Sequence, residues 1–236
     1  MNNNYYKTLD ENFTQALELY EKNHSHIELL ELLKDGNIVQ KQIAALKLES
    51  INSYQDAQIL LSNLTGQDGK IREAVSSRLK EFMAKPEFLQ FFKPVLNYKI
   101  FLDAITDING NICRNVISAI SNLRMDDDFC KVFCKELAEL SLELLDVVEQ
   151  FDFQDGKYKV NKEAFKLYWC LETVYEFWDK MESDKLKEII LRSKNIGEYT
   201  IREKAAKILS RGFEDEELAR AQKDLKNDMN YYVRRF

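Results

Sequence analysis

Hydrophobic residues recur along the chain at helical spacing, in segments separated by short polar turns. No run of β-branched residues alternates at period two, so no strand is needed. First helices of hairpins are expected over six ranges that share this spacing: Ile27 to Lys34, Asp56 to Leu64, Tyr98 to Thr106, Asp127 to Gln150, Lys185 to Ser193 and Glu216 to Leu225. The pattern predicts an all-α protein.

A turn with Asp, Asn or Gly follows each first helix, and a β-branched residue soon opens a second helix. These opening residues are Ile38, Ile71, Ile112, Val160, Ile201 and Val233. Apolar or small residues recur four, five and eight positions after them, a stripe that each second helix would bury against its neighbour. Separations of about 30 to 50 residues indicate a helical repeat array. Five of the seven glycines lie at these turns, where we expect a positive φ.

Capping boxes mark several helix starts. Ser25 with Glu28 and Thr200 with Glu203 have the required spacing. Thr8 with Glu11 has it too, and opens an extra helix to about Lys22 that would cap the N-terminal end of the array. Pro86 and Pro94 break the chain around Phe88, Phe91 and Phe92, which is interpreted as an insertion within the array.

The segments 68–75 (DGKIREAV) and 201–206 (IREKAA) resemble the turn and second helix of a HEAT repeat. The resemblance covers about residues 25–236 and implies a right-handed α-solenoid of about six HEAT-like helical hairpins with an extra N-terminal capping helix. In this interpretation residues 1–236 form one domain, with repeats at about 25–52, 54–84, 87–124, 126–180, 183–212 and 214–236. The family's arginine after the opening residue is present only as Arg72, Arg202 and Arg234, so any ladder of such residues is interrupted.

Composition narrows the class of protein further. The N-terminus lacks the basic start and apolar core of a secretory signal, and no apolar run approaches the roughly 20 residues of a membrane span. The chain is therefore expected to be cytoplasmic, without a membrane partner. The four cysteines fall inside predicted helices, away from His24 and His26, and are interpreted as small buried apolar residues rather than zinc ligands. No cofactor or metal is expected, and the acidic residues Asp126 to Asp128 are interpreted as a helix cap.

The net charge of −6 conceals an asymmetry between the two kinds of helix. The second helices and their flanks carry 17 Lys and Arg against 6 Asp and Glu, whereas the rest of the chain carries 17 against 34. Because second helices line the concave surface of a HEAT array, the resemblance implies a basic groove on an acidic body. The residues placed in this groove are Arg78, Lys80, Arg114, Lys162, Lys166, Lys204, Lys207 and Arg211, with Asn122 and Trp169 as contact residues. The alternative is an ordinary solvated helix face.

Several functions fit this pattern, and no catalytic motif singles out a reaction. We expect a non-catalytic protein-protein interaction scaffold whose groove holds a protein or peptide, and an acidic one. The alternative is nucleic-acid binding, in which the same groove contacts phosphates. A third reading is a DNA alkylation-repair glycosylase, which also uses HEAT-like repeats with a tryptophan and an aspartate. Here the tryptophans are Trp169 and Trp178, with Asp179 beside the second. The oligomeric state is left open.

Overall fold

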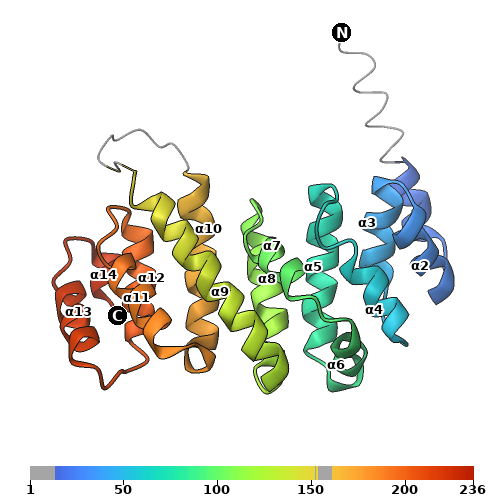
Figure 1. Ribbon diagram of the computed structural model, residues 1–236. Coiled ribbons are helices and arrows are strands. Elements are labelled where there is room, and N and C mark those ends of the chain that lie inside the picture. Colours follow the sequence, from blue (N-terminus) through green and yellow to red (C-terminus); the bar gives the residue numbers. More distant parts are fainter. Residues whose placement is uncertain (1–13, 152, 154–160) are drawn as a thin grey trace, which may run out of the picture. The chain divides into compact units, whose positions relative to one another are not determined.

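A computed structural model describes residues 14–151, 153 and 161–236, and all regular elements in this part of the chain are helical (Figure 1). The α-helices after an unlabelled helix at 14–21 are α2 (His26–Asp35), α3 (Ile38–Lys47), α4 (Tyr54–Leu61), α5 (Gly69–Met83), α6 (Pro86–Phe92), α7 (Tyr98–Ile105), α8 (Gly110–Ile120), α9 (Asp127–Val148), α10 (Lys162–Phe177), α11 (Ser183–Ser193), α12 (Tyr199–Leu209), α13 (Glu216–Lys226) and α14 (Tyr231–Arg234). Short 3-10 helices are η1 (Lys93–Val95), η2 (Ser121–Leu123) and η3 (Trp178–Lys180). The six predicted first helices are confirmed to within two or three residues at their ends.

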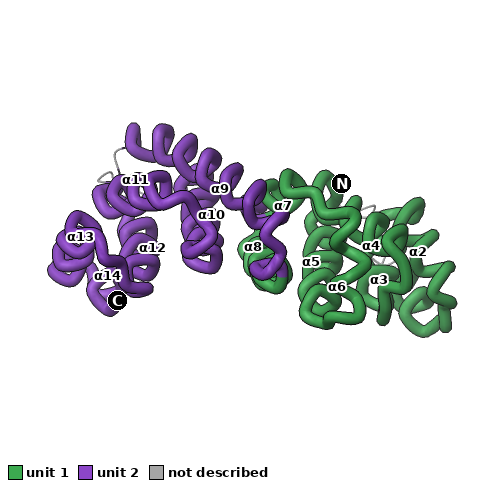
Figure 2. The backbone as a smooth tube through the Cα atoms, turned by 60° about the horizontal axis from the view of Figure 1, so that its bottom comes forward, with its two compact units in different colours: residues 1–104, 109–122 green, residues 105–108, 123–236 purple. Residues whose placement is uncertain are grey.

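The chain divides into two compact units, residues 1–104 with 109–122 and residues 105–108 with 123–236 (Figure 2). Within unit 1, α2 contacts α4 and α4 contacts α6, while α3 contacts α5 and α5 contacts α8. Within unit 2, α9 contacts α11 and α11 contacts α13, while α10 contacts α12 and α12 contacts α14. Each unit therefore holds two rows of stacked helices, which is the predicted α-solenoid arrangement. In unit 1 the row of α2 and α4 continues with α6, a helix that was not among the six predicted first helices. The single continuous domain stays a prediction.

None of the described glycines at the predicted turns has a positive φ, contrary to the prediction from the sequence. Among the described glycines, only Gly66 and Gly212 have positive φ, and neither is a glycine of the predicted turns. At the turns before α5 and α8, the Asp or Asn is instead the N-cap of the second helix: Asp68 accepts a hydrogen bond from Lys70 N, and Asn109 accepts one from Asn111 N. The polar residue thus satisfies an otherwise free amide at the helix start, and the glycine that follows it becomes the first helical residue. The Asp155-Gly156 turn and Val160 lie outside the described residues.

Gly36, at the α2–α3 turn, is required for a steric reason. A Cβ on this residue would lie 2.4 Å from Leu32 O and 2.8 Å from Gln40 Cβ. We expect Gly36→Ala to lower the free energy of unfolding by about 1–3 kcal/mol, because the turn must move to admit the methyl group. Gly69→Ala is the matched control, since nothing lies within 4 Å of its added Cβ and alanine favours the helix. Urea unfolding of the two variants checks this, and equal stabilities would contradict the steric explanation.

The predicted buried stripe is confirmed in three second helices and wrong in two. In α5, α8 and α12 the residues at zero, four, five and eight are all buried. In α3, however, Ile38 and Leu46 are 49% and 39% exposed, and the buried residues are Ala44 and Ala45, followed by the C-cap Leu48. The helix starts at Ile38 as predicted, but its buried stripe is displaced by two residues.

In α10 the predicted register is also wrong. Phe165 and Tyr168 were expected in the buried stripe and are only partly buried, whereas Leu167, Leu171 and Val174 are fully buried. Successive buried residues three or four apart fix which face of α10 meets its neighbours. As a result, Tyr168 of α10 is partly exposed to solvent, whereas Trp169 is buried.

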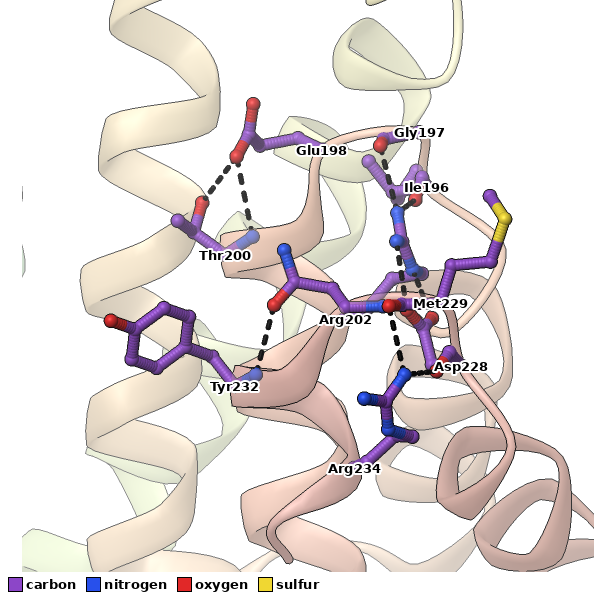
Figure 3. Close-up of polar contacts among 10 residues, drawn as sticks. Ile196, Gly197, Glu198, Thr200, Arg202, Asp228, Met229, Tyr232 and Arg234 are labelled. Carbon is purple, nitrogen blue, oxygen red and sulfur yellow. Dashed lines mark hydrogen bonds and ion pairs between the residues drawn. The ribbon is translucent and has the colours of Figure 1, made fainter.

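The arginine after the opening residue has a structural role at three turns. Arg202 pairs with Asp228 through Nε (2.7 Å) and donates from its NH1 nitrogen to Ile196 O (2.9 Å) and Gly197 O (2.7 Å) (Figure 3). Arg234 donates to Asp228 O and Met229 O in the same way, and Arg72 donates to Gln67 O. Each guanidinium therefore closes its own turn, and Arg202 also links two successive turns.

The predicted helix caps divide into one confirmed, one wrong and one outside the described residues. The capping box of Ser25 and Glu28 is present at the start of α2. At α12 the cap is Glu198, whose carboxylate accepts from Thr200 N, so the Thr200–Glu203 box is wrong. The Thr8–Glu11 box lies outside the described residues. The helix 14–21 is held at its end by Lys47, whose Nζ donates to Tyr20 O (2.7 Å) and Lys22 O (2.6 Å).

All four cysteines are buried free thiols, as the sequence predicts: Cys113, Cys130, Cys134 and Cys170. Burial raises the pKa of the Cys134 thiol to about 12, which keeps it in the unreactive thiol form at neutral pH. We expect none of the four to react with an aromatic disulfide reagent within minutes in the folded protein, and all four to react in denaturant. Spectrophotometric thiol titration measures this, and rapid labelling of the folded chain would show that the helices around them open.

Candidate functional site

One face of unit 2 gathers aromatic and cationic side chains from α10 and α12. On α10, Tyr168, Glu172 and Tyr175 follow each other at helical spacings of four and three, so they line one face of the helix. On α12, Lys204 and Lys207 are one turn apart and oppose them. Because α10 packs beside α12, the sequence spacing brings the two sets together.

A single carboxylate holds both lysines of this face. Glu172 accepts a hydrogen bond from Lys204 Nζ and another from Lys207 Nζ, each at 2.7 Å. Each lysine also lies over a tyrosine ring, Lys204 over Tyr168 and Lys207 over Tyr175, both 4.1 Å from the ring centroid. The arrangement is favourable because a desolvated ammonium gains from a carboxylate and from the negative face of a ring.

Arg211 extends the cluster beyond the end of α12. Its guanidinium lies 3.8 Å from the centroid of the Tyr175 ring and donates to Tyr175 O at 3.5 Å. Unlike Lys204, which is 7% exposed, Arg211 is exposed to solvent. Counting Glu172 against Lys204, Lys207 and Arg211, the cluster carries a net charge of two positive units.

The ionisation of the cluster follows from its burial and its partners. Burial opposes the charge of Glu172, but the hydrogen bonds from Lys204 and Lys207 outweigh it and hold the pKa of the carboxyl below its usual value. Burial likewise opposes the charge of Lys204, and the bond to Glu172 raises its pKa above the usual value. These directions keep both Glu172 and Lys204 in their charged forms at neutral pH.

An exposed aromatic group adjoins the cluster at the start of α12 and α14. The rings of Tyr199 and Tyr232 lie 6.3 Å apart, and the two side chains are 38% and 51% exposed. Arg235 lies beside Tyr232, at 5.4 Å from its ring centroid, and pairs with Glu203 at 2.5 Å. Glu203 falls on α12 between Tyr199 and Lys207, four residues from each. We call the residues Tyr168, Glu172, Tyr175, Tyr199, Glu203, Lys204, Lys207, Arg211, Tyr232 and Arg235 the second-helix face of unit 2.

The predicted groove residues of unit 1 do not form a comparable cluster. Arg78 pairs with Glu81 at 2.5 Å and donates to Leu46 O, which ties it to its own unit. Arg114 is exposed and donates to Asn111 Oδ1. Asn122 donates to Ser118 O and Ala119 O, so it caps the end of α8, and Lys80 is exposed to solvent. The contacts described for these side chains are therefore with groups of unit 1 itself.

In unit 2 the structure keeps some predicted residues at the surface and corrects others. Lys207 and Arg211 belong to the cluster, Lys162 is exposed, and Lys166 pairs with Glu163 at 3.1 Å. Trp169 is not a surface contact residue: it is 7% exposed, because the face of α10 that carries it packs inward. Lys204 is equally buried, so it supports the cluster from below rather than facing a ligand.

Other chemistry suggested by individual residues finds no constellation in the described part of the chain. No group of three or more His, Cys, Asp and Glu there could hold a metal ion. Asp179 pairs with Arg124 at 2.5 Å, and Trp178 packs edge-on against Phe213. Within the described residues, none of the helices combines the length and the apolar character needed to cross a membrane.

Of the comparisons with known proteins, the one with solved structures bears on the fold. No protein-family model matches the chain, and no curated protein matches it. Among solved structures, it is similar to a designed armadillo repeat protein, with 13% identity, a TM-score of 0.50, and coverage of 89% of this chain and 96% of the designed one. The fold is an armadillo-like helical repeat. An engineered protein is also similar, at 14% identity and a TM-score of 0.49, covering 90% of this chain and 93% of that one. The armadillo-like fold confirms the HEAT-type resemblance in kind, without a specific family.

Sequence reasoning found Lys204, Lys207 and Arg211 and missed the other seven residues of the second-helix face: Tyr168, Glu172, Tyr175, Tyr199, Glu203, Tyr232 and Arg235. Glu172, Tyr168 and Tyr175 were overlooked because the register of α10 was displaced, which put the tyrosines in the core. Their spacing, Tyr-x3-Glu-x2-Tyr on one helix opposite Lys-x2-Lys on the next, is a signal that could have found them. Tyr199 gave no signal of its own, since its role depends on a ring from α14.

Proposed function

We propose that the protein is a non-catalytic interaction scaffold whose second-helix face of unit 2 binds an acidic segment of another protein. The observation that carries this proposal is the sharing of Glu172 by Lys204 and Lys207, with Arg211 stacked beside them. One carboxylate cannot neutralise three cations, so the face attracts a second carboxylate from outside.

The composition of this face supports protein binding in particular. Tyr and Arg are the residues most enriched at the energetic centres of protein interfaces, since their rigid groups bury much area at low entropic cost. Here the tyrosine rings are already held by cation–π contacts at about 4 Å, so little freedom is lost on binding. The surface is thus preorganised for a ligand.

The first test compares two charge removals on different units. A fluorescently labelled ten-residue peptide of alternating Glu and Gly is titrated with the protein, and anisotropy reports binding. We expect Lys207→Gln with Arg211→Gln to weaken binding by about tenfold or more, because both cations face the ligand. The matched control, Lys70→Gln with Lys80→Gln, removes the same charge from exposed positions of α5 in unit 1 and should change binding less than about twofold. Equal losses in both variants would overturn the proposal.

A second ligand separates the nucleic-acid alternative. A labelled 20-base-pair duplex of random sequence is titrated under the same conditions and at several salt concentrations. Phosphate binding by several cations gives an affinity that falls steeply with salt. We expect the duplex to bind more weakly than the acidic peptide, whereas tighter duplex binding with a steep salt slope would overturn the scaffold proposal in favour of nucleic-acid binding.

A further inference from the structure

The second-helix face of unit 2 presents its groups in a fixed order along α12. Tyr199, with Tyr232 beside it, lies at the start of the helix; Glu203, neutralised by Arg235, lies one turn later; Lys207 lies two turns later. The order is therefore aromatic, neutral, cationic. Because α12 is a regular helix over residues 199–209, the separation of these groups is fixed.

The separation of the aromatic and cationic ends can be estimated from helix geometry. Tyr199 and Lys207 are eight residues apart, which corresponds to about 12 Å along the helix axis at 1.5 Å per residue. An extended peptide covers about 3.3 Å per residue, so about four of its residues span the same distance. A ligand lying along α12 would therefore meet the tyrosines and the cations with residues about four positions apart.

The two ends would select different side chains. At the cationic end, Lys207 and Arg211 attract a carboxylate. At the aromatic end, the Tyr199 and Tyr232 rings leave apolar surface exposed, which favours a side chain with its own apolar area. In the middle, the Glu203–Arg235 pair offers no net charge, so the ligand needs none there.

We propose that the partner segment is an extended peptide in which an apolar side chain precedes or follows a carboxylate by about four residues, the apolar group resting on Tyr199 and Tyr232 and the carboxylate on Lys207 and Arg211. The inference rests on the proposed function, because it names the ligand of the same face. It goes further because it specifies the spacing between the apolar side chain and the carboxylate of the ligand. A carboxylate alone would contact only the cationic end of the face.

The test uses labelled ten-residue peptides of Gly and Ser that carry one Phe and two Glu. In the matched peptide the Glu residues lie four and six positions from Phe, and both chain directions are made. In the rearranged peptide, of identical composition, Phe is adjacent to the first Glu. We expect one direction of the matched peptide to bind about tenfold more tightly than the rearranged one, since only it reaches both ends of the face. Equal affinity of the matched and rearranged peptides would overturn the inference.

A tyrosine substitution locates the effect on the protein. Tyr232→Ala is expected to abolish the preference for the matched peptide over the rearranged one, because it removes a ring on which the Phe side chain would rest. Tyr54→Ala on α4 is the matched control, because both tyrosines are 51% exposed, and it should retain the full preference. A preference that survives Tyr232→Ala overturns the inference and leaves the scaffold proposal standing, whereas failure of every acidic peptide to bind the wild-type protein overturns both.

Discussion

Replacing Arg202 with alanine is expected to lower the free energy of unfolding by about 3 kcal/mol, the cost of leaving one member of a buried ion pair alone. The guanidinium side chain is 18% exposed and its partner Asp228 is 10% exposed, so water cannot replace the lost contacts fully. The variant also leaves the carbonyls of Ile196 and Gly197 without this donor. Two successive turns of unit 2 would lose their link at once (Figure 3).

Two further variants separate the stability that comes from the several hydrogen bonds of the Arg202 guanidinium from the stability that comes from its charge. Arg202→Lys keeps the charge but cannot reach the carboxylate and both carbonyls, so it should recover only part of the stability. Arg235→Ala is the control, since its pair with Glu203 is more exposed and worth little. Urea unfolding followed by circular dichroism measures all three. An Arg202→Ala variant as stable as Arg235→Ala would show that the turns are held by helix packing alone.

Replacing Glu172 with glutamine is expected to cost about 2 kcal/mol, because Lys204 is buried and would lose its charged partner. The double variant Glu172→Gln with Lys204→Met should regain much of this loss, since no buried charge then remains unpaired. Its stability, measured by urea unfolding, separates the ion pair from general packing of α10 on α12. If the double variant is no more stable than the single one, the buried charge is not the cause.

The pH dependence of the Glu172 variant has a defined sign. The folded pKa of Glu172 lies below its unfolded value of about 4.3. The stability that ionised Glu172 contributes to the fold is therefore fully present above the unfolded pKa and is lost as the pH falls through the folded pKa. The stability difference between wild type and Glu172→Gln should therefore be constant near neutral pH and shrink below about pH 4. A difference that grows on acidification would contradict the assignment of a charged Glu172.

Most of the helices and their order could be predicted because they depend on local signals, but α6 was missed, since Pro86 was interpreted as a break although it begins the helix. A polar N-cap, an apolar stripe and a short turn suffice to define α5, α8 and α12, and all three stripes were predicted correctly. The arginines at positions 72, 202 and 234 were recognised as a feature of the repeat, and the structure shows them closing turns. Local sequence therefore determines most of the fold.

The candidate site could be predicted only in part, because it depends on the register of one helix. The two lysines of α12 were identified from their charge. The predicted register of α10, however, placed the partly exposed Tyr168 in the core and the buried Trp169 at the surface. Val160, used to set that register, lies outside the described residues. Pairing of lysines with Glu172 depends on contacts between helices about 30 residues apart in sequence, which charge counting along one helix cannot reveal.

If the second-helix face of unit 2 is the recognition surface for acidic segments, as we propose, a bound peptide should protect the helices that form it. Hydrogen exchange with mass spectrometry, recorded with and without the Phe–Glu matched peptide, tests it most directly by mapping where binding protects backbone amides. We expect added protection in α10, α12 and α14, with α5 and α8 of unit 1 and α13 of unit 2 unchanged. Protection confined to unit 1, or to the row of α9, α11 and α13, would contradict it.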